Sequence, residues 1–213
     1  MDVRFTGGPD DMVTWIASDP GIMQRASHAL VTDDGTWLVD PVDHPHVRER
    51  LGTLPPVVGV LQLLDRHGRD CAAMAADLGV PLLVTPTAPV AGTPFEVIVV
   101  RDGRTWHETA LWWPARHALV VAEAVGTPPY FRASPGQVIG PHPFMRVRPP
   151  RMLEGYPARH VLMGHGNPVH RDDAGALVDA AIAHARGTTP RWLLSLATGS
   201  VRRADGRSPN VAP

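Results

Sequence analysis

Length, composition and charge place the chain among globular domains. It has 213 residues, of which 44% are hydrophobic and 19% charged, and a formal net charge of −1, so no field steers it to nucleic acid or an anionic membrane. The single cysteine, Cys71, excludes an internal disulfide and a thiolate metal cluster. The chain contains neither an apolar run of about 18 residues nor a secretion-signal pattern. We therefore expect no nucleic-acid or membrane partner and a cytoplasmic location, while the oligomeric state stays open.

The first part of the chain alternates strands and helices. We predict a hairpin over 29–40, a helix over 47–51, a strand over 57–64, a helix over 71–78 and a strand over 81–84. Asp33-Asp34-Gly35 supplies the hairpin turn, and Gly79 is placed to end the second helix. This order is typical of an α/β unit, in which polar residues gather at the carboxyl end of a strand.

The second part of the chain is richer in strands. We predict strands over 95–100, 105–113, 118–125 and 160–163, and a helix over 174–185. The segment 126–158 is rich in Pro and Gly and predicts a long loop with irregular turns. Because neither a repeat nor a second core is visible, we predict one domain over 1–201 and a disordered tail over 202–213.

Four motifs resemble those of the metallo-β-lactamase superfamily, and they come in the same order. They are Leu-Val-Asp-Pro at 38–41, Leu-Leu-Asp-Arg-His-Gly-Arg-Asp at 63–70, a hairpin from Glu-Thr-Ala-Leu at 108–111 to residue 124, and Gly-His-Gly at 164–166. The second stands where the family has Thr-His-x-His-x-Asp-His, and the third where a hairpin ends in Gly-Asp. The resemblance covers residues 28–185 and implies an α/β fold, an αββα sandwich of two mixed sheets flanked by helices.

The resemblance also implies that several metal ligands of the family's two-metal hydrolase site are replaced here. Carried over by position, the family's metal ligands fall on Asp65, His67, Arg69, Asp70, Arg104, Glu123 and His165. Only two of these are still histidines. An arginine is a permanent cation that offers only hydrogen-bond donors, so it cannot bind a metal ion.

One interpretation is a metal-poor site with reduced or lost hydrolytic activity. In it, Arg69 would be an internal counter-ion that pairs with Asp65, Asp70 and Glu123, because buried carboxylates need a partner. A related alternative is a non-catalytic module that binds a small-molecule ligand in the same cleft.

The other interpretation keeps one divalent ion, which would be zinc, manganese or iron. Its ligands would be His67, Asp70, Glu123 and His165, with Asp65 as a further ligand or the catalytic base. Such a site suits the hydrolysis of a small ester, lactone or thioester.

Simpler structural roles compete with each of these assignments. The charged loop with Asp65, Arg69 and Asp70 is equally typical of a solvated, salt-linked loop and helix cap. Glu123 lies among apolar residues, which favours an inward carboxylate, and glycines on both sides of His165 favour a site. His142 lies in a Pro-rich loop and is expected at the surface.

Overall fold

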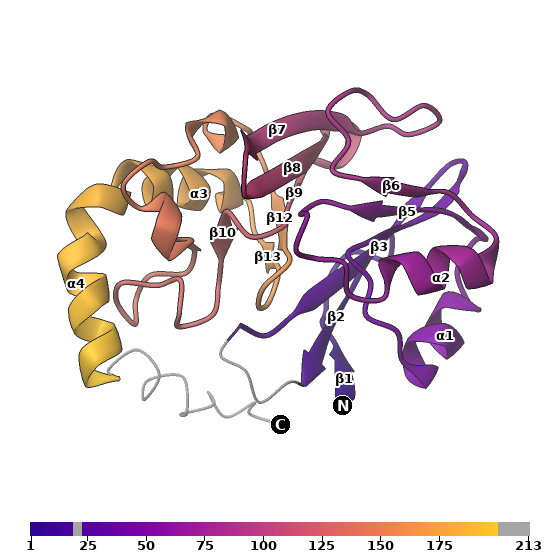
Figure 1. Ribbon diagram of the computed structural model, residues 1–213, viewed down its shortest axis with the longest axis horizontal. Helices are drawn as coiled ribbons and strands as arrows, with labels where there is room; N and C mark the ends of the chain where they lie inside the picture. The colour runs from indigo at the N-terminus through magenta and orange to yellow at the C-terminus, as the bar shows by residue number, and fades with distance from the viewer. Residues whose placement is uncertain (19–22, 200–213) are drawn as a thin grey trace.

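Two mixed β-sheets pack face to face between two layers of helices (Figure 1). The structure is a computed structural model, and it describes residues 1–18 and 23–199. This arrangement is the αββα sandwich that the motifs predict. The predicted domain end at residue 201 and the predicted tail over 202–213 lie outside the described residues.

The first sheet has six strands in chain order. They are β1 (Asp2–Phe5), β2 (Met12–Ser18), β3 (Ala26–Thr32), β4 (Gly35–Val39), β5 (Val57–Gln62) and β6 (Leu82–Val84). The first four strands pair antiparallel, whereas β4, β5 and β6 run parallel. Parallel strands need crossover connections, and two short helices supply them: α1 (Pro45–Leu51) follows β4, and α2 (Cys71–Leu78) follows β5.

The second sheet has the strand order β13-β12-β9-β8-β7. Its strands are β7 (Glu96–Gly103), β8 (Trp106–Trp113), β9 (Ala118–Val121), β12 (His160–Met163) and β13 (Val169–His170). Only β9 and β12 pair parallel. The long segment between them forms a two-stranded ladder, β10 (Val125–Gly126) with β11 (Gly140–Pro141), and the short 3-10 helices η2 (Pro143–Met145) and η3 (Arg151–Leu153). A third, η1 (Pro114–Arg116), joins β8 to β9.

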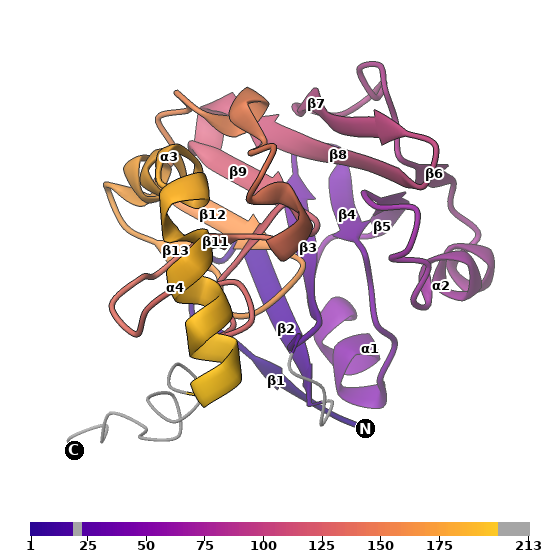
Figure 2. The ribbon, with the colours of Figure 1, turned by 60° about the vertical axis from the view of Figure 1, so that its left-hand side comes forward.

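Apolar residues fill the space between the layers. Leu30, Leu61, Leu111 and Val120 belong to one large core cluster that joins the two sheets. A smaller cluster packs α1 and α2 against the outer face of the first sheet. On the other side, α3 (Ala174–Ala183) covers the second sheet beside β12, and α4 (Ala185–Thr198) follows it (Figure 2). Among the described residues, no helix is both long and apolar enough to cross a membrane.

The predicted elements agree with the observed ones where periodicity is strong. The hairpin over 29–40 is β3 and β4, and the helix over 71–78 ends at Gly79 in the left-handed conformation (φ 67°). The unpredicted elements include β1, β2 and α4. Helix α4 is easily overlooked because it contains Pro190 and buries few residues.

Candidate metal centre

The site forms where strands of both sheets end. Asp40 directly follows β4, His67 lies in the loop after β5, Glu123 follows β9, and His165 follows β12. Because β4 and β5 run parallel, as do β9 and β12, the carboxyl ends of each pair lie together. The two sheets also meet here, since the backbone N–H of Ala26 donates to the carbonyl oxygen of Gly164 at 2.8 Å. The four residues that follow these strands therefore belong to one site.

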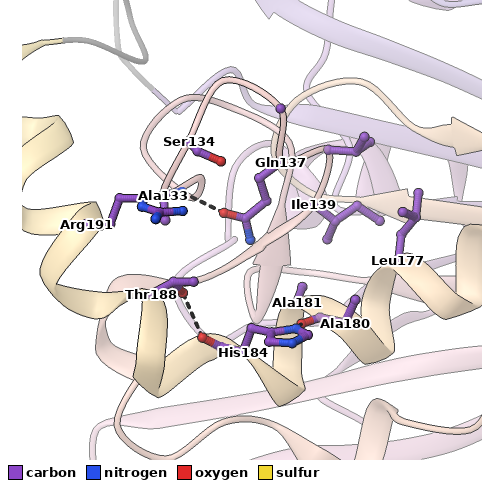
Figure 3. A pocket seen from close by; sticks show the side chains of 12 residues that line it. Ala133, Ser134, Gln137, Ile139, Leu177, Ala180, Ala181, His184, Thr188 and Arg191 are labelled. Carbon is purple, nitrogen blue, oxygen red and sulfur yellow. Dashed lines mark hydrogen bonds between the residues drawn. The ribbon is translucent and has the colours of Figure 1, made fainter.

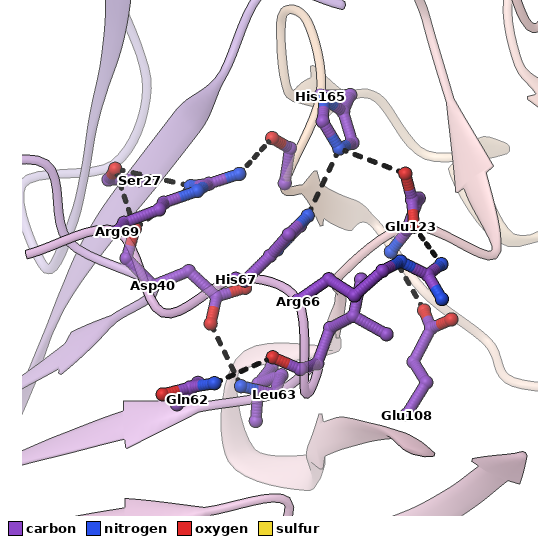
Figure 4. A network of polar contacts seen from close by, with 12 residues as sticks. Ser27, Asp40, Gln62, Leu63, Arg66, His67, Arg69, Glu108, Glu123 and His165 are labelled. Atoms are coloured by element: carbon purple, nitrogen blue, oxygen red, sulfur yellow. Dashed lines mark hydrogen bonds and ion pairs between the residues drawn. The ribbon is translucent and has the colours of Figure 1, made fainter. Parts of the chain in front are cut away.

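His67 and His165 face each other across this place, with 3.1 Å between their Nε2 atoms (Figure 4). Nδ1 of His67 donates to Oδ2 of Asp40 at 2.8 Å, and Nδ1 of His165 donates to the carbonyl oxygen of Met23 at 2.9 Å. Because both partners accept, each neutral ring carries its hydrogen on Nδ1 and a lone pair on Nε2. Two lone pairs this close repel each other, and a cation bound to both nitrogens would relieve the repulsion.

The environment keeps both imidazoles neutral. Burial lowers the pKa of His67, and the nearby Arg69 guanidinium lowers it further, against the opposite effect of Asp40. Burial also lowers the pKa of His165 well below its usual value, and His67 and Arg69 act in the same direction. Neutral imidazole is the form that binds metal ions.

Glu123 supplies the negative charge of the site. Its Oε1 lies 3.7 Å from Nε2 of His165, and its Oε2 accepts a hydrogen bond of 2.7 Å from Nη2 of Arg66 (Figure 4). Arg66 thus holds one carboxylate oxygen and leaves the other directed at the imidazoles. The inward orientation of Glu123, which its apolar neighbours favoured, is observed.

His142 is a site residue that the sequence did not indicate. Only 4% of it is exposed, and its Nε2 lies 3.8 Å from Oε1 of Glu123. Its Nδ1 accepts a hydrogen bond from the backbone N–H of Phe144 at 3.3 Å, so the neutral ring carries its hydrogen on Nε2. Burial lowers the pKa of His142 to about 4. His142 is therefore a neutral donor that faces Glu123, and the expectation of a surface position was wrong because segment 126–158 folds back over the site.

Two further carboxylates form hydrogen bonds that hold the ligand residues in position. Asp40 is 1% exposed and binds both His67 and the backbone N–H of Leu63, the latter at 2.8 Å. Glu108 is fully buried, and its Oε1 accepts from the backbone N–H groups of Glu123 and of Ala124 at 2.7 and 2.8 Å. Burial raises the pKa of Glu108 to about 7, although these N–H donors act in the opposite direction.

Arg69 pairs with no carboxylate in the described part of the chain, which corrects its predicted role as a counter-ion to Asp65, Asp70 and Glu123. The residue is half-buried, and its guanidinium donates to the backbone carbonyl oxygens of Ala26, Asp40 and Gly164, the last at 2.8 Å. It holds the ends of three strands together beneath the two histidines. The arginine that pairs with Glu123 is its neighbour in the loop, Arg66.

The other predicted residues lie apart from the imidazoles. Oδ2 of Asp65 accepts from the backbone N–H of His107 at 3.0 Å, and Oδ2 of Asp70 accepts from the backbone N–H of Asp43 at 2.8 Å. Neither belongs to the group of converging ligand atoms. Arg104 lies in the exposed turn between β7 and β8. Position in a motif placed all three residues in the site, but hydrogen bonds to the backbone direct the Asp65 and Asp70 side chains elsewhere.

Three ligand atoms have the spacing that one metal ion requires. Nε2 of His67, Nε2 of His165 and a carboxylate oxygen of Glu123 all lie within 4.8 Å of one another. Two nitrogens bound to zinc at about 2.0–2.1 Å with a tetrahedral angle are about 3.3 Å apart, which is close to the observed 3.1 Å. Within residues 1–18 and 23–199, no other group of three such side chains converges in this way. The donor set fits one ion rather than two.

A cavity of about 400 Å³ opens beside these ligands. It is lined by Met23, Gln24, Arg25, Arg66, His67, Glu123 and His165. A second cavity, of about 270 Å³, lies between the loop 133–139 and helices α3 and α4 (Figure 3). No predicted site residue lines this second cavity. The cavity beside the histidines is therefore the candidate substrate cavity.

We expect the Gly164→Ala variant to lose about 1–3 kcal/mol of stability and to bind metal more weakly. A Cβ at Gly164 would lie 2.4 Å from the carbonyl oxygen of Ala122 and 2.9 Å from Cε1 of His67, so the strand ends could not approach as they do. Urea unfolding measures the first effect. Gly68→Ala is the control because a Cβ there meets nothing within 4 Å, and equal losses in both variants would contradict the steric argument.

Comparison with known proteins identifies the fold. No family model and no curated protein matches the chain. Solved structures do match: DIM-1 metallo-β-lactamase exposed to ceftazidime has a TM-score of 0.61 at 13% identity, over 89% of this chain and 97% of its own. The metallo-β-lactamase from Pontibacter korlensis gives 0.61 at 13% identity over 87% and 99%. The one from Hirschia baltica gives 0.59 at 11% identity over 87% and 98%.

The chain therefore has the metallo-β-lactamase fold, as its motifs predicted. Within that fold it carries a buried group of two histidines and one glutamate. Identity at this level establishes the fold and not the reaction, because one fold supports many functions.

Proposed function

We propose that the protein binds one divalent metal ion through His67, Glu123 and His165 and uses it to hydrolyse a small ester, lactone or thioester. The observation that carries the proposal is the opposition of two imidazole lone pairs at 3.1 Å, each fixed by a hydrogen bond on the other side of its ring. Metal-binding histidines are oriented in this way by carboxylate and carbonyl partners. Zinc is the ion that best suits two imidazoles and a carboxylate, with manganese and iron as alternatives.

The surrounding residues suit hydrolysis. A divalent ion at this place would polarise a substrate carbonyl and lower the pKa of a water molecule. Asp40 keeps His67 in the tautomer that can bind an ion, and the neutral His142 directs a donor at Glu123. The cavity beside them has room for a small substrate. Asp65 is not placed to act as a base on a molecule in this cavity, since its carboxylate bonds to β8.

Metal content is the direct test. Untagged protein purified without chelator is expected to contain about one equivalent of metal, because three protein ligands with an open position are typical of a catalytic ion. A variant with both His67→Ala and His165→Ala should contain less than about 0.1 equivalent. The matched control replaces another facing pair, His160 and His170, whose Nδ1 atoms are 3.0 Å apart. Loss of metal in the control alone would contradict the proposed site.

The ion pair between Arg66 and Glu123 favours a second candidate function, ligand binding without catalysis. The Arg66 guanidinium already pairs with Glu123 at 2.7 Å and is a permanent cation beside the imidazoles. In this candidate Arg66 replaces the ion, and the cleft binds a small molecule without turnover. Wild-type protein with less than about 0.1 equivalent of metal, and no hydrolysis of an ester, lactone and thioester panel, would select it.

A further inference from the structure

The cavity beside the histidines has a cationic wall. Arg25 and Arg66 both line it, and Glu123 is the only acidic residue among its described lining residues. Nearly half of the Arg66 side chain, 45%, is exposed. A divalent ion bound to the two histidines and Glu123 would add positive charge next to the Arg66 guanidinium, which favours an anion there.

Several contacts hold the Arg66 guanidinium in one orientation. Its guanidinium lies over the ring of Trp106, with 4.1 Å from Cζ to the ring centroid. The Trp106 ring is in turn fixed by a hydrogen bond of 2.9 Å from its Nε1 to Oε2 of Glu108. Nη2 of Arg66 donates to Glu123, and Nη1 donates to the carbonyl oxygen of Thr105 at 3.3 Å. A guanidinium has five N–H donors, so three remain beyond these two bonds on a residue that lines the cavity.

We propose that Arg66 recognises a carboxylate on the substrate. This inference rests on the proposed function, because the recognised group would belong to the molecule whose ester or thioester bond lies at His67, His165 and Glu123. An arginine in a fixed plane suits a carboxylate, which it binds through parallel N–H groups. A monoanion is enough, since Glu123 already offsets part of the charge of Arg66. The substrate class is therefore a small carboxylate-bearing ester or thioester, and Arg66 determines the specificity.

The test compares two ligands that differ in one charge. Monomethyl succinate carries an ester and a carboxylate, whereas dimethyl succinate carries no charge. We expect metal-loaded wild-type protein to bind the monomethyl ester about 10–100-fold more tightly by calorimetry, as a charge-assisted hydrogen bond predicts. Arg66→Gln should remove this preference, and Arg66→Lys should restore part of it. Arg101→Gln is the matched control, because Arg101 also lies near the Trp106 ring, at 5.6 Å, but does not line the cavity.

The outcomes separate this inference from the proposed function. Calorimetry of the metal-free protein reports binding without turnover, so an intact preference in protein that neither retains metal nor hydrolyses esters would overturn the proposed function alone. A preference that survives in Arg66→Gln would overturn the role of Arg66 and assign anion recognition to Arg25 or to the metal ion. Equal affinity of wild-type protein for both esters would also overturn the role of Arg66. The metal content of each variant is measured first, so that a lost ion is not mistaken for a lost guanidinium.

Discussion

Replacing Glu108 with alanine is expected to lower the free energy of unfolding by about 3–5 kcal/mol, because buried N–H groups lose their acceptor and a cavity opens. The carboxylate accepts three hydrogen bonds, from the backbone of Glu123 and Ala124 and from the Trp106 ring. These donors are shielded from the surface, since Glu108 is fully buried. Chemical denaturation of the metal-free protein measures the loss without a contribution from the ion.

The same variant should also bind metal more weakly, because Glu108 fixes the backbone from which Glu123 projects. Glu96→Ala is the control, since Glu96 is an exposed residue at the start of β7. It should change the stability by less than about 0.5 kcal/mol. A Glu108→Ala variant that is as stable as this control would show that the turn at residues 122–124 does not depend on the carboxylate.

Replacing Asp40 with asparagine is expected to weaken metal binding by about 10–100-fold, the usual cost of losing the partner of a metal-binding histidine. An asparagine can still accept from the backbone N–H of Leu63, but its amide N–H₂ then faces Nδ1 of His67. The imidazole must accept that bond, so its hydrogen moves to Nε2 and the lone pair directed at His165 is lost. Competition with a chelator of known affinity measures the change.

The control for this substitution is Asp70→Asn, in the loop that also carries His67. Sequence position made Asp70 a metal ligand, but its carboxylate accepts from the backbone N–H of Asp43. We expect the metal affinity of this variant to stay within about twofold of the wild-type value, as for a residue outside the ligand group. A large loss of affinity for Asp70→Asn, with none for Asp40→Asn, would contradict the ligand set described above.

Much of the fold could be predicted because its signals are local. The hairpin at 29–40, the buried strand after it and the alanine-rich helix 71–78 each have a periodicity or a turn residue that identifies them. The site was predicted in part, since Glu123, His67 and His165 do converge. The errors concerned Asp65, Arg69 and Asp70, because a motif gives the position of a residue along the loop but not the direction of its side chain.

The residues missed at the site share one property: their partners are far away in the chain. His142 meets Glu123 only because the segment after β10 folds back, and no local pattern in a Pro-rich stretch indicates this. Asp40 was noticed only as the end of a strand, yet its carboxylate determines the tautomer of His67, 27 residues later. Arg66 differs from Arg69 by three positions in the same charged loop, and only the packing of Trp106 shows which of them faces the cavity.

The amino-acid sequence alone determined many of the strands and helices, the fold and the two histidines, because local periodicity and short motifs carry that information. Only the tertiary structure decided which carboxylate lies beside the two histidines and which arginine lines the cavity. It also decided which carboxylates form hydrogen bonds to the ligand residues. These properties depend on hydrogen bonds between side chains and backbone groups of different strands, such as those of Arg69 to Ala26 and Gly164. Such bonds exist only once the two sheets have packed together.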